Sequence, residues 1–119
     1  MLAFLLREPG KDRVIEAILA GAEMTTANFA EVATRYVLRG AAAEASALRE
    51  LLPVSLVPVD EDLALRAALM ADRTRPAGLS LGDRLCLAHA IRRGIPALTA
   101  DRSWLAVAGA LGAQIELLR

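Results

Sequence analysis

Residues 79–104 constrain the fold of this chain most, because they read as a helix followed at once by a buried strand. Ser80 and Asp83 form an S-x-x-D pattern, a capping box that begins a helix. Gly94 is the residue expected at its left-handed end. The apolar run 95–100 then favours a parallel strand, with Asp101 at its carboxyl end. This order of elements predicts an α/β fold.

Apolar, β-branched runs alternate with helical patterns along the rest of the sequence. Helices are predicted at 2–8, 12–20, 28–38, 41–52, 61–75, 81–93 and 104–110, and strands at 22–26, 54–59, 95–100 and 114–118. Asn28 and Asp60 are the expected caps of the helices that follow them. Strands that alternate with helices indicate a parallel sheet with right-handed crossovers, in one domain covering 1–119.

Composition excludes several classes of protein. A formal net charge of zero and 55% hydrophobic residues argue against a disordered chain and against a basic nucleic-acid module. Aromatic residues make up only 3%, which disfavours RNA binding by stacking. One cysteine, Cys86, and one histidine, His89, exclude a disulfide framework and disfavour a zinc site. The apolar start MLAFLL is too short to span a bilayer, so we expect no membrane association and a cytoplasmic location.

Acidic residues follow the predicted strands. In a parallel sheet every strand-to-helix turn lies at one edge, so Glu31, Asp83 and Asp101 are expected to converge. Converging carboxylates repel one another unless a cation lies between them, which predicts Mg²⁺ or Mn²⁺ and a metal-activated water for phosphodiester hydrolysis. Arg84 and Arg102 would hold flanking phosphates. Taken singly, each acid is better explained as part of a helix cap, and it is the three together at one sheet edge that indicate a site.

Three segments carry a family resemblance: NFAE at 28–31, RPAGLSLGDRLCLAHA at 75–90 and PALTADRSW at 96–104. They resemble the PIN-domain ribonucleases, specifically the VapC-type toxins of toxin-antitoxin pairs. The resemblance implies a five-stranded parallel sheet of order 3-2-1-4-5 flanked by helices. It also implies Mg²⁺- or Mn²⁺-dependent endoribonuclease activity on tRNA or rRNA, homodimerisation, and a cognate antitoxin that blocks the site.

The same resemblance assigns residues to roles. Glu31, Asp83 and Asp101 match three acidic positions of the family that act in catalysis and metal binding. The nearby polar positions of the family are matched by Asn28, Ser80 and Thr99.

The chain departs from the family pattern at its start. Family members begin with a strand ending in D-x-S-A-L, whose aspartate is a metal ligand, whereas Met1 falls inside the helix that follows. Three outcomes are predicted: strands 22–26 and 96–100 pair directly, another chain donates a strand, or the natural product begins upstream. The alternative function is a weak or inactive PIN homologue that serves as a dimerisation or antitoxin-binding module.

Overall fold

The computed structural model describes residues 10–118, which fall into two compact units that meet in the sequence between Pro58 and Val59. The helix predicted at 2–8 lies outside the described residues. Each unit contains one pair of parallel strands with its own helices. The units are treated in turn below.

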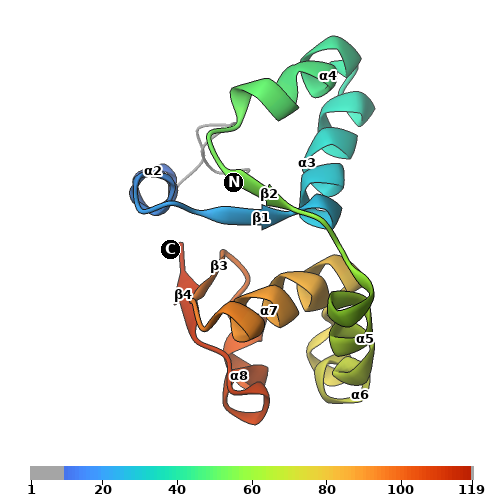
Figure 1. Ribbon diagram of the computed structural model, residues 1–119, viewed down its shortest axis with the longest axis vertical. Coiled ribbons are helices and arrows are strands. Elements are labelled where there is room, and N and C mark those ends of the chain that lie inside the picture. Colours follow the sequence, from blue (N-terminus) through green and yellow to red (C-terminus); the bar gives the residue numbers. More distant parts are fainter. Residues whose placement is uncertain (1–9, 119) are drawn as a thin grey trace. The chain divides into compact units, whose positions relative to one another are not determined.

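The first unit is built on a short parallel strand pair. Its elements are α2 (Lys11–Leu19), β1 (Glu23–Thr25), α3 (Thr26–Leu38), α4 (Ala42–Leu51) and β2 (Ser55–Val57). Strand β1 runs from α2 to α3, and α3 and α4 lie side by side (Figure 1). Glu23 lies opposite Ser55 in the parallel register. Val32 of α3 forms the core cluster of this unit with Leu48 and Leu52, which are four residues apart, the spacing that puts two side chains on one face of a helix.

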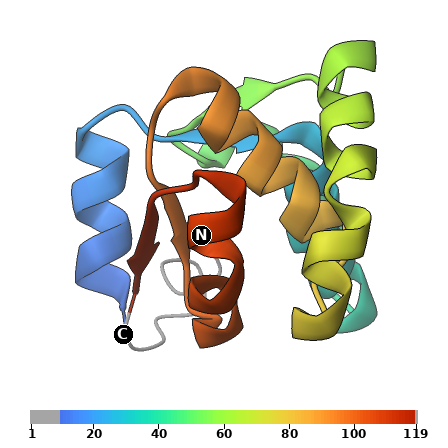
Figure 2. The same ribbon diagram turned by 90° about the horizontal axis from the view of Figure 1, so that it is seen from below.

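The second unit is mostly helical. Its elements are α5 (Glu61–Leu69), α6 (Ala71–Thr74), η1 (Arg75–Ala77), α7 (Leu81–Arg93), β3 (Ala97–Thr99), η2 (Arg102–Trp104), α8 (Leu105–Leu111) and β4 (Ile115–Leu117). Helices α5 and α7 pack side by side (Figure 2). Leu63 and Ala67 of α5 and Leu87 of α7 are fully buried. Strands β3 and β4 are parallel, with Ala97 opposite Ile115.

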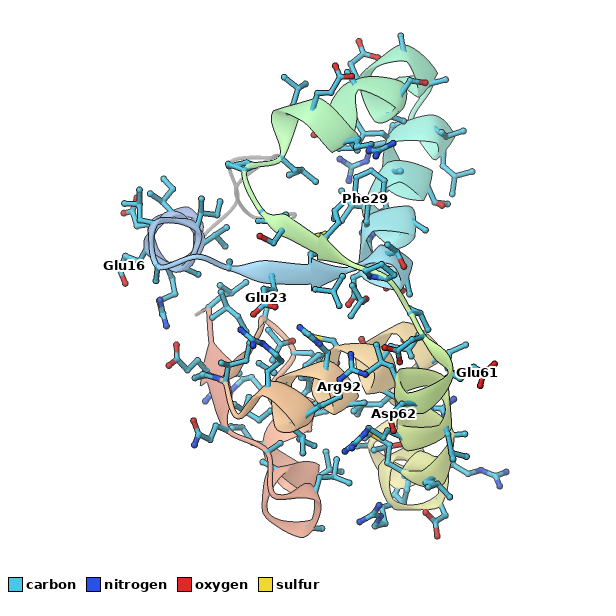
Figure 3. The ribbon with its side chains drawn as sticks, in the orientation of Figure 1. Glu16, Glu23, Phe29, Glu61, Asp62 and Arg92 are labelled. Carbon is cyan, nitrogen blue, oxygen red and sulfur yellow. The ribbon has the colours of Figure 1, made fainter. Side chains whose placement is uncertain are left out.

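A cluster of charges joins α5 to α7. Arg92 donates to both carboxylate oxygens of Asp60, each at 3.1 Å, and to Asp62 at 3.3 Å. Its side chain extends from α7 toward Asp62, whereas Glu61 points away (Figure 3). Asp60 also caps α5, as predicted, by accepting from the amide of Leu63. One carboxylate thus both begins α5 and ties it to α7.

The helix predicted at 61–75 is interrupted, and that prediction was wrong. It is divided at Met70 into α5 and α6, and η1 follows. Pro76 lies in the first turn of η1 and has no amide hydrogen, so a regular α-helix cannot continue through it. The hydroxyl of Thr74 accommodates the short turn by donating to the carbonyl of Met70 at 2.9 Å. Nothing in the sequence signals the break at Met70 itself.

The strands form two separate parallel pairs, β1 with β2 and β3 with β4. Within residues 10–118 these are the strand pairs formed, and direct pairing of strands 22–26 and 96–100, one of the three predicted outcomes, is not among them. The five-stranded order 3-2-1-4-5 implied by the resemblance stays a prediction. Parallel pairing and alternating helices confirm the α/β fold class. Within residues 10–118, none of the helices has the length and apolar character needed to cross a bilayer.

Candidate metal-binding carboxylates

Glu31 is held by a chain of hydrogen bonds that starts at the end of β1. Thr25, which is 2% exposed, donates through its hydroxyl to the side-chain oxygen of Asn28 at 2.7 Å. The side-chain nitrogen of Asn28 in turn donates to Oε1 of Glu31 at 2.9 Å. Residues three apart are neighbours on a helix, so α3 itself places Asn28 beside Glu31. The chain orients one carboxylate oxygen of Glu31.

The cap of this helix is not the predicted one. Helix α3 begins at Thr26, and Thr25 caps it by accepting from the amide of Asn28 at 3.1 Å. Asn28 therefore lies inside the first turn and does not open the helix. The hydroxyl of Thr25, at the last position of β1, reaches the third amide of the helix, which is the contact an N-cap makes. The side chain of Asn28 is directed at Glu31.

Asp83 is oriented by the capping box that the sequence predicts. Ser80 accepts from the amide of Asp83 at 3.3 Å, and Oδ2 of Asp83 accepts from the amide of Ser80 at 3.0 Å. Helix α7 therefore begins as expected, and it ends at Gly94 in the left-handed conformation. Leu81, the first residue of α7, is 57% exposed. The box fixes the carboxylate of Asp83 at the first turn of α7.

Asp101 follows β3 and caps η2. Its Oδ1 accepts from the hydroxyl of Ser103 at 2.7 Å and from the amide of Ser103 at 2.9 Å. These bonds, the hydroxyl bond first, lower the pKa of Asp101 below its ordinary 3.8. The amide of Asp101 donates to the hydroxyl of Thr99 at 3.0 Å. Ser103 was missed in the sequence, although Asp followed two residues later by Ser is a known local pattern for such turns.

The three acids share one feature of their bonding. In each, one carboxylate oxygen accepts local hydrogen bonds: Oε1 of Glu31, Oδ2 of Asp83 and Oδ1 of Asp101. Among the described residues, the second oxygen of each carboxylate accepts no hydrogen bond, and none of the three acids is paired with an arginine. Carboxylates that ligate metals are typically held in this way by second partners. Their hard oxygens fit Mg²⁺ or Mn²⁺.

Within residues 10–118, no group of three or more acidic, histidine or cysteine side chains is close enough to hold a metal. Glu31 belongs to the first unit, and Asp83 and Asp101 belong to the second. Their convergence on one ion therefore stays a prediction. So does the role of Arg84 and Arg102 toward phosphate; Arg84 donates to the carbonyl of Ala67 at 3.0 Å, and Arg102 lies exposed in η2.

Comparison with known families identifies the fold. Residues 1–110 match the PIN domain family. No curated protein is similar enough in sequence to match the chain. PIN domains are generally metal-dependent nucleases, which agrees with carboxylates at strand-to-helix turns whose second oxygens are open. Because the match covers most of the sequence and the parallel α/β architecture agrees with it, this chain belongs to the PIN domain family.

Proposed function

We propose that this chain is a Mg²⁺- or Mn²⁺-dependent endoribonuclease that acts as the VapC-type toxin of a toxin-antitoxin pair. The proposed substrate is structured RNA, either tRNA or rRNA, cleaved by phosphodiester hydrolysis. The proposed setting is the cytoplasm, where the chain would form a homodimer and a cognate antitoxin would block its site. The observation that carries the proposal is the shared bonding of Glu31, Asp83 and Asp101, each with one oxygen held and the other open.

The proposed site residues divide the work between metal and substrate. Glu31, Asp83 and Asp101 would hold the ion through their open oxygens, and Arg84 and Arg102 would bind flanking phosphates. A bound divalent ion supplies an acidified water and neutralises charge on the phosphate. The hydrogen bonds from Ser103 favour the charged form of Asp101 and lower its pKa further. Asn28 keeps Glu31 in one orientation, so less conformational freedom is lost on binding.

The decisive test is cleavage of RNA by the full chain. Purified protein is incubated with tRNA and with rRNA in Mn²⁺, and the products are resolved on a denaturing gel. We expect internal cuts that vanish in EDTA and in Asp101→Asn. Asp72→Asn is the matched control, because Asp72 is an exposed acid of the same unit that accepts only from the amide of Arg73. Cleavage that survives Asp101→Asn would contradict the assignment.

The alternative function has a separate outcome in the same experiment. A chain that leaves both RNAs intact at every Mn²⁺ concentration, yet elutes as a dimer in size-exclusion chromatography with light scattering, would favour a dimerisation or antitoxin-binding module. Cleavage by a chain that elutes as a monomer would support the proposed nuclease activity and contradict the proposed homodimer.

A further inference from the structure

The second unit contains a cavity that is not lined by any of the three acids. Its volume is about 350 Å³, at the lower end of the range of roughly 300 to 1,000 Å³ typical of ligand pockets. It is formed where α6, η1 and the start of α7 meet. Its lining residues are Ala71, Arg75, Gly78, Leu79 and Arg84. Two arginines from different elements therefore line one cavity.

Neither arginine is neutralised. Elsewhere in the chain, Arg66 and Arg92 are paired with carboxylates of α5 and its cap. Within residues 10–118, no such pair exists for Arg75 or Arg84. The sequence contains as many acidic as basic residues, so acidic partners are not scarce. Two unpaired guanidinium groups beside one cavity indicate a site for an anion.

The two arginines differ in how firmly they are held. Arg84 is partly buried and donates to the carbonyl of Ala67 at 3.0 Å, which restrains its side chain while its other N–H groups stay available. Arg75 is exposed on η1. Gly78 has a φ of 73°, a conformation that side chains rarely adopt, so this wall of the cavity stays backbone. The cavity is therefore lined by one restrained arginine, Arg84, and one exposed arginine, Arg75.

We propose that this cavity binds a phosphate group of the nucleic acid on which the chain acts, with Arg75 and Arg84 as its ligands. The inference rests on the proposed nuclease function, and it adds Arg75, which is not among the site residues proposed above. The planar fork of a guanidinium matches two phosphate oxygens at once. Asp83, one of the proposed metal ligands, immediately precedes Arg84 on α7. A phosphate repeats at every nucleotide, so an RNA held for cleavage offers a further phosphate to a neighbouring cavity.

The test measures binding without catalysis. A fluorescent single-stranded oligodeoxynucleotide is titrated with the full chain in EDTA, and anisotropy is recorded at several salt concentrations. Arg75→Gln should weaken binding by about tenfold, as expected for one lost charge-assisted contact. It should also reduce the slope of log Kobs against log salt by about 0.7, the value for one phosphate contact on a single strand.

Controls separate this cavity from general charge. Arg73→Gln removes the same charge from the neighbouring helix α6, where Arg73 is exposed and does not line the cavity, so its affinity should change by less than about twofold. Arg84→Lys keeps the charge but loses the fork, and it should weaken binding as well. Equal effects of Arg75→Gln and Arg73→Gln would overturn the proposal.

Competition experiments test which class of ligand the cavity binds. Inorganic phosphate should displace the oligonucleotide from the native chain, and a comparison of oligonucleotides with and without a 5′-phosphate distinguishes a strand end from an internal phosphodiester. Binding of a hexaglutamate peptide in place of the oligonucleotide would overturn the assignment to phosphate. Because no metal is present, a chain that fails to cleave RNA can still pass this test, and a chain that cleaves RNA can still fail it.

Discussion

At the scale of single residues, the hydrogen bonds around Asp101 predict a measurable ionisation effect. Its pKa is lowered first by the hydroxyl of Ser103 and then by the amide of Ser103. Ser103→Ala removes only the hydroxyl, so the pKa of Asp101 should rise toward its ordinary 3.8. Titration of the carboxyl carbon by NMR measures this shift in native protein and variant.

Ser46→Ala is the control, because the hydroxyl of Ser46 donates only to the carbonyl of Ala42 on α4. It should leave the pKa of Asp101 unchanged. A pKa of Asp101 that stays the same or falls in Ser103→Ala would refute the assigned cause.

Asn28 carries the second prediction at this scale. Its side chain joins Thr25 to Glu31, and Asn28→Ala leaves Oε1 of Glu31 without its donor. If Glu31 is a metal ligand, the affinity for Mn²⁺ should fall roughly ten- to hundredfold, the usual effect of removing a partner of a ligand. Isothermal titration calorimetry measures the affinity.

Circular dichroism of the same variant tests for a merely structural effect, because alanine is a good helix former inside α3. The helix signal should be retained. Unchanged Mn²⁺ affinity in Asn28→Ala would show that the hydrogen-bond chain does not serve a metal site.

At the scale of elements, the contact between α5 and α7 predicts how stability depends on pH. The pKa of Asp60 is lowered by the amide of Leu63 and then by Arg92, and that of Asp62 by Arg66 and then by Arg92. Lowered carboxyl pKa values stabilise the folded state above the ordinary value of 3.8, and this contribution is lost as the pH falls through the lowered values. Unfolding by urea should therefore become easier below pH 3.8.

Arg92→Gln measures how much of the pH-dependent stability comes from the contact of Arg92 with Asp60 and Asp62. The variant should be less stable than the native chain at neutral pH, and the difference should shrink in acid. Arg49→Gln is the matched control, since Arg49 lies exposed in the last turn of α4 as Arg92 lies in the last turn of α7. A constant difference between Arg92→Gln and native protein at every pH would exclude the carboxylates as its source.

At the scale of the whole molecule, the prediction concerns cooperativity. Within residues 10–118, the sheet of each unit is one pair of three-residue strands, and two-stranded sheets are marginally stable by themselves. Because neither sheet is expected to be stable alone, we expect the chain to behave as a single domain and to unfold in one step. Trp104, the only tryptophan, is buried in the second unit, so its fluorescence reports that unit alone, whereas far-UV circular dichroism reports both.

Urea midpoints from the two signals should coincide. Two transitions in circular dichroism, with only one in the fluorescence of Trp104, would mean that the units unfold independently. The prediction of a single domain would then be wrong.

Local chemistry made much of this fold predictable. The capping box at Ser80 and Asp83, the cap at Asp60 and the left-handed Gly94 are all as predicted, because each depends on groups within a few residues of one another. The cap of α3 was misplaced from Thr25 to Asn28, since both residues can accept an amide and the end of β1 decides between them. The break at Met70 was not predicted either.

The sequence by itself determined the order of helices and strands, the carboxylates at the turns and the PIN resemblance, because these depend on short-range periodicity and spacing. Only the tertiary structure decided which strands pair, that Arg92 neutralises Asp60 across 32 positions, and that Arg75 and Arg84 border one cavity. The physical reason is that pairing and neutralisation are set by distances through space. Local propensities decide which segments form helices and strands, but they do not decide which of these segments come together in space.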